Sequence, residues 1–342
     1  MTQLFSRNFR KRAYGMYALL TCVNLGGWIW AFFLFHDKPV LLGTAFLAYT
    51  FGLRHAVDAD HIAAIDNVTR KLMQEGKRPL SVGFFFSLGH STVVVVASLI
   101  VYSIAAAVEN QFDYLKEIGA AIGTSISSLF LIAIALMNMV ILRGVWRTFQ
   151  EVRKGGSYDD QGSEMLLGGG VMARLFRPLF RMLSHPWHMY PIGFLFGLGF
   201  DTATEVALLG ISAAAAAKGL SVGAMAVFPV LFTAGMTLVD TTDGILMVGA
   251  YGWAFIKPIR KLYYNLTITF VSVIVALIVG GIEAVGLLKG RFNLTGGVWD
   301  FIGSNLGFVI IGVFVLSWFG SVIFYRVKGF DRLESTTPTM PE

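Results

Sequence analysis

The clearest chemical signal in this sequence is a set of histidines and carboxylates placed inside long apolar stretches. An ionisable side chain inside a bilayer costs about 2.5–3.5 kcal/mol on insertion scales, so such residues indicate a binding site or a path for charge. Most of them fall near residues 54–66, 90, 201–205 and 240–243. The candidate metal ligands are His55, Asp58, Asp60, His61, His90, Asp201, Glu205, Asp240 and Asp243.

The densest group is the run Arg-His-Ala-Val-Asp-Ala-Asp-His that begins at Arg54. On a regular α-helix each residue advances by about 100°, so Asp58 lies about 60° from His55 and His61 about 60° further round. These three residues share one face, whereas Asp60 lies about 140° from His55. Either Asp60 supports the ligands from outside that face, or the helix is distorted here.

Two imidazoles and a carboxylate on one face suit a divalent first-row metal, because imidazole favours nickel, cobalt, copper and zinc. Asp60 or Asp66 can orient a ligating imidazole through its second nitrogen. The single cysteine, Cys22, excludes a multi-cysteine metal cluster.

Two other interpretations use the same residues. In the first, Arg54 pairs with Asp58, and Asp201 with a histidine, in an internal ion-pair network that binds no ligand. In the second, the Asp, Glu and His side chains form a proton relay. Both alternatives stay open at this point.

Membrane helices must position these residues. Of the 342 residues, 55% are hydrophobic and 14% are charged, against about 25% charged in soluble domains. A membrane span needs about 20 apolar residues, and eight such stretches are present. The sequence therefore predicts an all-α polytopic membrane protein with spans at about 15–35, 41–66, 82–108, 119–142, 189–216, 222–250, 263–288 and 298–325.

The basic residues indicate topology and exclude nucleic acid as a partner. With both termini in the cytoplasm, most of the 27 Lys and Arg residues, including Arg70 and Lys71, fall on the inner side. Arg54 lies within a span, and the outer side holds Lys38, Lys116, Lys218, Lys289 and Arg291. This is the positive-inside pattern of a multi-pass protein, and we expect it in the cytoplasmic membrane.

The predicted spans form two groups of four. An N-terminal half (1–142) is followed by a cytoplasmic linker (143–188), a C-terminal half (189–325) and a cytoplasmic tail (326–342). Val171–Leu183 in the linker has apolar and basic residues at helical spacing, which is typical of a helix lying on the membrane surface. Gly83–Thr92 also matches Gly193–Thr202 at six of ten positions, as in transporters built from repeats.

These motifs together resemble the nickel/cobalt transporter (NiCoT) family of eight-helix permeases. The resemblance is carried by His55, Asp60 and His61 within Arg54–Ile62, and by three further motifs: Leu88–Val94, Leu198–Glu205 and Gly235–Gly244. It implies high-affinity uptake of Ni²⁺ or Co²⁺ as the transported substrate, no organic cofactor, both termini in the cytoplasm, and a requirement for His55, Asp60 and His61.

Two alternatives remain at this stage. A permease for zinc or manganese fits the same ligands, because metal selectivity depends on geometry. A metal-dependent membrane enzyme is disfavoured, because the sequence has no His-Glu-x-x-His motif and only six histidines. The expected partners are thus a metal ion and the lipid bilayer.

Overall fold

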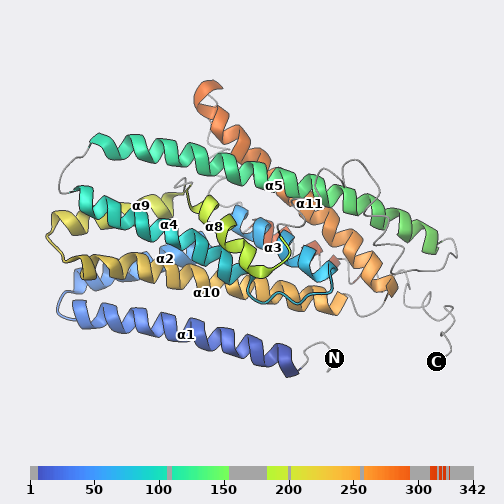
Figure 1. Cartoon of the computed structure of the whole chain (residues 1–342), viewed down its shortest axis with the longest axis horizontal. Helices are drawn as coiled ribbons and strands as arrows, with labels where there is room; N and C mark the ends of the chain where they lie inside the picture. Colours follow the sequence, from blue (N-terminus) through green and yellow to red (C-terminus); the bar gives the residue numbers. More distant parts are fainter. Residues whose placement is uncertain are drawn as a thin grey trace.

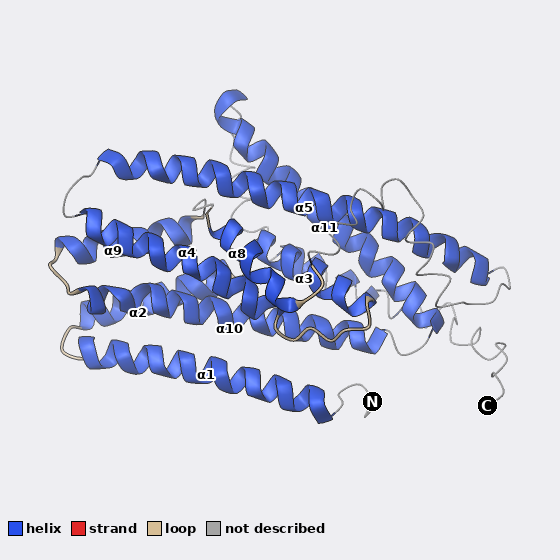
Figure 2. Ribbon diagram, viewed as in Figure 1, coloured by secondary structure: helices blue, strands red, loops and turns tan. Residues whose placement is uncertain are grey.

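Helices account for every secondary-structure element among the described residues (Figure 2). The computed structural model describes residues 7–105, 110–153, 183–198, 202–254 and 258–292, with residues 309–313, 316–317, 319–320 and 323. The elements are α1 (Arg7–Phe35), α2 (Pro39–His55), α3 (Ala59–Gln74), α4 (Val82–Ala105), α5 (Asn110–Arg153), the 3₁₀ turn η1 (Pro186–His188), α8 (Met189–Gly197), α9 (Ala203–Ala217), α10 (Val222–Ala254) and α11 (Pro258–Phe292).

Four described helices, α1, α4, α5 and α10, are long and apolar enough to cross a membrane, and α2 with α3 makes a fifth if the bent pair is one span. The four correspond to the spans predicted at 15–35, 82–108, 119–142 and 222–250. The prediction of an all-helical, multi-pass membrane protein is confirmed at this level. Within the predicted last span, 298–325, the described residues between 309 and 323 are helical.

The span predicted at 41–66 is not one helix, and the face assignment that assumed a regular helix there is wrong. α2 ends at His55 and α3 begins at Ala59, with a bend of 51° between them. Asp58 has extended backbone angles and occupies the N-cap position of α3, a place that aspartate favours. His55 and His61 therefore belong to different helices. The residues expected in the following loop, Arg70 and Lys71, lie inside α3 and are buried.

The span predicted at 189–216 is also broken. α8 ends at Gly197, and α9 begins after the N-cap residue Thr202, whose side chain accepts a hydrogen bond from the Glu205 backbone N–H. Asp201 lies outside the described residues. Broken helices are tolerated at membrane depth where the irregular backbone is buried in protein or lines a cavity.

The helix α10 is the centre of the bundle. It packs against α1, α2, α3, α4 and α9, and Figure 1 shows the short elements α3 and α8 in the middle of the molecule, with α1 along one side and α5 along the other. The two broken spans therefore meet at the core, beside α4 and α10.

Glycines set the closest helix approaches. A Cβ atom at Gly52 of α2 would overlap the carbonyl oxygen of Phe232 in α10, and one at Gly235 would lie 2.7 Å from the Tyr49 carbonyl oxygen. In the same way, a Cβ at Gly89 of α4 would overlap the Tyr190 carbonyl oxygen of α8. Small residues let membrane helices approach this closely, so these contacts fix α2 against α10 and α4 against α8.

The repeated segments from the sequence meet in one of these contacts. Gly83–Thr92 lies in α4, and the part of Gly193–Thr202 that the structure describes runs through α8 to the N-cap of α9. A Cβ at Gly193 would overlap the Phe86 carbonyl oxygen. Of the predicted amphipathic segment Val171–Leu183, only Leu183 is among the described residues.

Candidate metal centre

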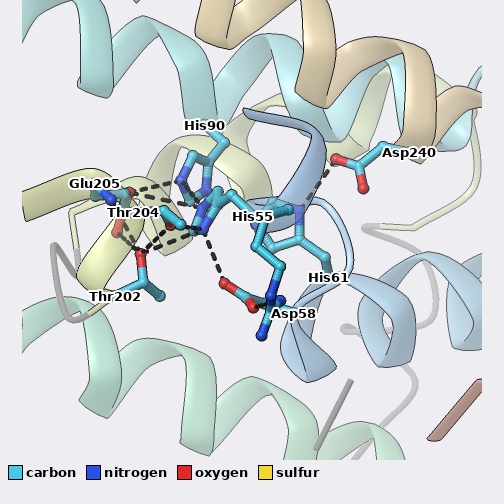
Figure 3. Close-up of polar contacts among 9 residues, drawn as sticks. His55, Asp58, His61, His90, Thr202, Thr204, Glu205 and Asp240 are labelled. Atoms are coloured by element: carbon cyan, nitrogen blue, oxygen red, sulfur yellow. Dashed lines mark hydrogen bonds and ion pairs between the residues drawn. The ribbon is translucent and has the colours of Figure 1, made fainter. Parts of the chain in front are cut away.

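Three buried histidines from three helices converge at the first helix break. His55 is the last residue of α2, His61 lies in the first turn of α3, and His90 lies in α4. Their exposed fractions are 1%, 0% and 2%. One ring nitrogen from each lies within 4.8 Å of the others, and Figure 3 shows the three rings facing a common space. We call these residues the histidine triad.

A carboxylate from the second helix break completes this group. The Nε2 atoms of His55 and His90 are 2.9 Å apart, and Glu205 Oε1 lies 2.9 Å from His90 Nε2 and 3.8 Å from His55 Nε2. Glu205 is 1% exposed and lies in the first turn of α9. Two imidazole nitrogens and a carboxylate oxygen therefore surround one point, which is a ligand set for a divalent cation.

Asp58 contacts the outer nitrogen of His55 and not the space between the rings. Its Oδ2 atom lies 3.0 Å from His55 Nδ1, and its Oδ1 atom accepts a 2.6 Å hydrogen bond from Arg54 Nη1. A carboxylate in this position fixes the tautomer and orientation of a ligating imidazole. The Arg54–Asp58 pair of the ion-pair interpretation is thus present, as part of the support for His55.

Asp240 holds His61 in the same manner. Its Oδ2 atom lies 3.1 Å from His61 Nδ1 and accepts a 2.5 Å hydrogen bond from Ser87 Oγ. His61 Nε2 is buried and has no hydrogen-bond partner among the described residues. Buried polar atoms are normally paired, so an unpaired ring nitrogen facing two other imidazoles indicates a ligand. This observation favours a metal site over a closed ion-pair network.

The remaining predicted ligands lie at different positions. Asp60 is half-buried in the first turn of α3 and makes no hydrogen bond or ion pair with any residue that the structure describes. Asp243 lies in α10, one turn beyond Asp240, and its Oδ2 atom is buried without a partner in the same described set. Asp66 was expected, as an alternative to Asp60, to orient an imidazole and not to bind the metal. It accepts hydrogen bonds from Tyr251 and Ser272 and contacts none of the triad, whose outer nitrogens contact Asp58 and Asp240 instead.

Carboxylates stand at the N-termini of both helices that begin at the site. α3 and α9 both begin at the site, and a helix N-terminus carries a partial positive charge that opposes a bound cation. Asp58 and Asp60 stand at the start of α3, and Glu205 stands in the first turn of α9. Their negative charges compensate for both helix ends and leave the site suited to a cation.

Two threonines and a serine at this site were missed at the sequence level. Thr202 donates a hydrogen bond of 3.0 Å to Glu205 Oε2, and the hydroxyl oxygens of Thr202 and Thr204 each lie 3.3 Å from His55 Nδ1. Thr202 and Glu205 have the Thr-x-x-Glu spacing of a helix-start capping box, a signal that could have located this break. Ser87 had no such signal.

Comparison with known proteins agrees with this chemistry. The family model of high-affinity nickel-transport proteins, NicO, matches residues 41–324. A high-affinity nickel transport protein of Cupriavidus necator is 57% identical over 326 residues, covering 93% of each chain. The nickel transporter NicT of Mycobacterium tuberculosis is 45% identical over 343 residues, covering 96% of this chain and 91% of that one.

A cobalt transporter is also similar. The cobalt transport protein NhlF of Rhodococcus rhodochrous is 40% identical over 296 residues, covering 84% of each chain. No solved structure matches significantly. The family match covers most of the chain and includes all three triad histidines, so this chain belongs to the family of high-affinity nickel-transport proteins.

Proposed function

We propose that this chain is an uptake permease that carries Ni²⁺ and Co²⁺ across the cytoplasmic membrane by way of the histidine triad. The observation that carries the proposal is the convergence of His55, His61 and His90 in a buried space where His61 Nε2 has no partner among the described residues. The names of the relatives, nickel transporters and one cobalt transporter, support both metals.

The ligands proposed for the bound ion are the triad nitrogens and Glu205. Asp58 and Asp240 act on the ion through the rings that they hold. Asp60 follows the N-cap of α3 by two residues and has no hydrogen bond or ion pair with a described residue, and its proposed role is to attract an entering cation. Asp201 is retained as a proposed ligand because it directly precedes Thr202 in the sequence.

The distance of 2.9 Å between His55 Nε2 and His90 Nε2 is that of a hydrogen bond between two imidazoles. Imidazole and carboxylate ligands accept several divalent metals, so competition between metals is the decisive measurement of specificity.

For the topology, we propose eight spans in two halves of four, with the 143–188 linker and both termini in the cytoplasm. The distribution of Lys and Arg supports this orientation. A potential of 100 mV, negative inside, then contributes about 4.6 kcal/mol to the entry of a divalent cation, which corresponds to accumulation of about a thousandfold or more.

Membership in a transporter family also decides between transporter and enzyme: the chain is a transporter. A permease for zinc or manganese remains the competing specificity. The two specificities predict different results in a competition experiment. If zinc or manganese is the true substrate, an excess of that ion must suppress the uptake of labelled nickel more strongly than Co²⁺ does.

Uptake of labelled Ni²⁺ and Co²⁺ by cells that produce the wild type, His55→Ala or His36→Ala tests the proposal. His36 is the matched control, since its side chain is 52% exposed and it pairs with Asp37 outside the site. We expect saturable uptake that His55→Ala abolishes and His36→Ala preserves. Equal uptake by His55→Ala and wild type would refute the site, and stronger suppression by Zn²⁺ or Mn²⁺ than by Co²⁺ would refute the specificity.

A further inference from the structure

The helix α3 carries a second polar cluster, between the histidine triad and the end of the helix at Gln74. Asp66 and Arg70 follow His61 along the helix axis by about 7.5 and 13.5 Å. Their exposed fractions are 0% and 1%. In the proposed topology this end of α3 faces the cytoplasm, so an ion that leaves the triad inward has to pass the level of these two residues.

Asp66 joins α3 to two other helices. Its Oδ1 atom accepts a hydrogen bond from Tyr251 of α10, and its Oδ2 atom accepts one of 2.7 Å from Ser272 Oγ of α11. Both partners are buried. One turn and a half further on, Met73 packs in the same buried apolar cluster as Tyr251. The Asp66 carboxylate therefore holds α3, α10 and α11 together on the inner side of the triad.

Arg70 makes few hydrogen bonds for a buried guanidinium, which has five N–H donors. Its Nη2 atom donates a 2.8 Å hydrogen bond to Asn67 Oδ1, an oxygen that also accepts one of 2.5 Å from Asn138 Nδ2. Its Nε and Nη1 atoms are buried without a partner among the residues that the structure describes. Leaving a buried charged donor unpaired is costly, so these nitrogens indicate a partner that Arg70 acquires in another state.

Asp66 is the carboxylate that Arg70 can reach. An aspartate and an arginine at i, i+4 spacing are neighbours on a helix surface, and the charges of these two residues interact. Arg54 and Asp58 have the same spacing and are in direct contact at 2.6 Å. The Asp66 oxygens are instead occupied by hydroxyl groups from α10 and α11. An arginine can bind both oxygens of a carboxylate at once, so Arg70 can replace both hydroxyls.

We propose that Asp66 and Arg70 form the inner gate of this permease. In the closed state Asp66 binds Tyr251 and Ser272, and the unpaired Arg70 cation repels a divalent ion at this level. In the open state Asp66 pairs with Arg70 and releases both hydroxyls, so that α10 and α11 can separate from α3.

The gate rests on the proposed function and extends it from ion binding to ion release. The carboxylate is hydrogen-bonded in both states, and the open state exchanges two neutral donors for one charge-assisted pair. His61 lies on the same helix as Asp66, so a shift of α3 that accompanies ion binding also moves the gate. Packed helix interfaces of this kind change between discrete arrangements.

Labelling of a cysteine beside the gate measures its opening. Thr69 is 0% exposed and lies within one turn of both gate residues. Thr69→Cys is introduced together with Cys22→Ser, which removes the single native cysteine. Inside-out vesicles with this full-length protein are treated with a membrane-impermeant maleimide, with and without Ni²⁺. Ser98→Cys in the same background, at a serine of α4 that is also 0% exposed, is the matched control and should stay unlabelled.

Substitutions on the two sides of the gate should act in opposite directions. We expect Ser272→Ala, which weakens the closed state, to raise the labelling rate by about threefold or more. Arg70→Gln removes the partner of the open state, so we expect labelling to fall by about threefold and Ni²⁺ uptake by cells to fall by about tenfold, while the Ni²⁺ dissociation constant of the purified protein stays within about threefold. Arg10→Gln, at an exposed arginine of α1, is the matched control. Equal labelling of the Arg70→Gln and Arg10→Gln variants would overturn the proposal.

The unfolding midpoint separates a gate from a structural role. We expect the midpoint of Arg70→Gln not to fall, because the substitution removes a buried cation with two unpaired nitrogens. A lower midpoint that accompanies the loss of uptake would show that Arg70 only stabilises the fold, and would overturn the gate.

Two further outcomes are distinct. If removal of chloride lowers Ni²⁺ uptake by the wild type and Arg70→Gln lacks this dependence, then Arg70 holds an inorganic anion and the gate is refuted. If the wild type does not transport Ni²⁺ while Ser272→Ala still raises the labelling of Thr69→Cys, the proposed function fails and the gate stands.

Discussion

The two helix breaks use the same backbone device for different chemistry. The break between α2 and α3 supplies two imidazoles, His55 and His61, while the break between α8 and α9 supplies a carboxylate, Glu205, and the hydroxyls of Thr202 and Thr204. α4 lies against both and adds His90. A nitrogen of His55 from one break, an oxygen of Glu205 from the other and a nitrogen of His90 from α4 thus meet at one point (Figure 3).

The capping residues of the two breaks show how the roles differ. Thr202 caps α9 in the usual way, by accepting a hydrogen bond from the Glu205 N–H. Asp58 stands at the N-cap of α3 but makes no capping hydrogen bond, because its oxygens contact Arg54 and His55. From His61 to Met73 every residue of α3 is buried, so tertiary packing holds the helix whose cap is used for the site. This contrast leads to five predictions.

Glu205→Gln should have the largest effect. It keeps the shape of the side chain but removes the charge that lies 2.9 Å from His90 Nε2. Truncating a buried charged contact costs about 3–5 kcal/mol, so we expect Ni²⁺ uptake to fall by about 100-fold or more. Uptake by cells with labelled Ni²⁺ measures this. Asp37→Asn, at a surface carboxylate that is 81% exposed, should be silent; if Glu205→Gln is also within twofold of wild type, the second break has no part in the site.

Gly52→Ala tests whether glycine packing holds the first break. The new methyl group would overlap the Phe232 carbonyl oxygen, and overpacking costs about 1–3 kcal/mol. We expect a lower thermal unfolding midpoint of the purified protein and a smaller folded yield. Gly43→Ala on the same helix, where no atom lies within 4 Å of the added methyl group, should change neither. Equal midpoints for the two variants would contradict the close packing of α2 on α10.

Asp58→Asn tests the support of His55. Loss of a carboxylate behind a ligating imidazole typically lowers metal affinity by about 10–100-fold. Equilibrium binding of Ni²⁺ to purified protein measures this, and we expect the unfolding midpoint to fall as well, because the Arg54 pair is lost.

Asp60→Asn provides the contrast to Asp58→Asn. Asp60 has no hydrogen-bond or ion-pair partner among the described residues, so its replacement should leave the unfolding midpoint unchanged. Uptake should fall, because the proposed role of Asp60 is to attract the entering cation. If Asp60→Asn destabilises the protein as much as Asp58→Asn does, the two aspartates have been assigned the wrong roles.

Thr202→Ala should have the smallest effect. It removes the N-cap of α9 and the hydrogen bond to Glu205 Oε2, and losing a cap costs about 1 kcal/mol. We expect a modest loss of stability and of Ni²⁺ affinity, both restored in Thr202→Ser, which keeps the hydroxyl group. Thermal unfolding with and without Ni²⁺ measures both quantities. A Thr202→Ala loss as large as that of Glu205→Gln would show that the threonine is itself a ligand.

The sequence by itself determined the class of the protein and the kind of site. Apolar stretches of about 20 residues indicate helical membrane spans, because a helix satisfies its backbone groups within the segment. Histidines and carboxylates inside those stretches are costly, and so indicated a metal site. The motif around His55 and His61 and the motif around Glu205 both belong to the site.

Tertiary structure alone decided which side chains face one another at the candidate site. A helical wheel places His55, Asp58 and His61 on one face only if the helix is unbroken, and whether a helix continues through Ala56–Asp58 depends on what packs around it. The break turns Asp58 toward Arg54 and lets His61 approach His55 from a second helix. Glu205, Asp240 and His90 lie far from this segment in the sequence, so their contacts with it depend on helix packing that local spacing does not encode.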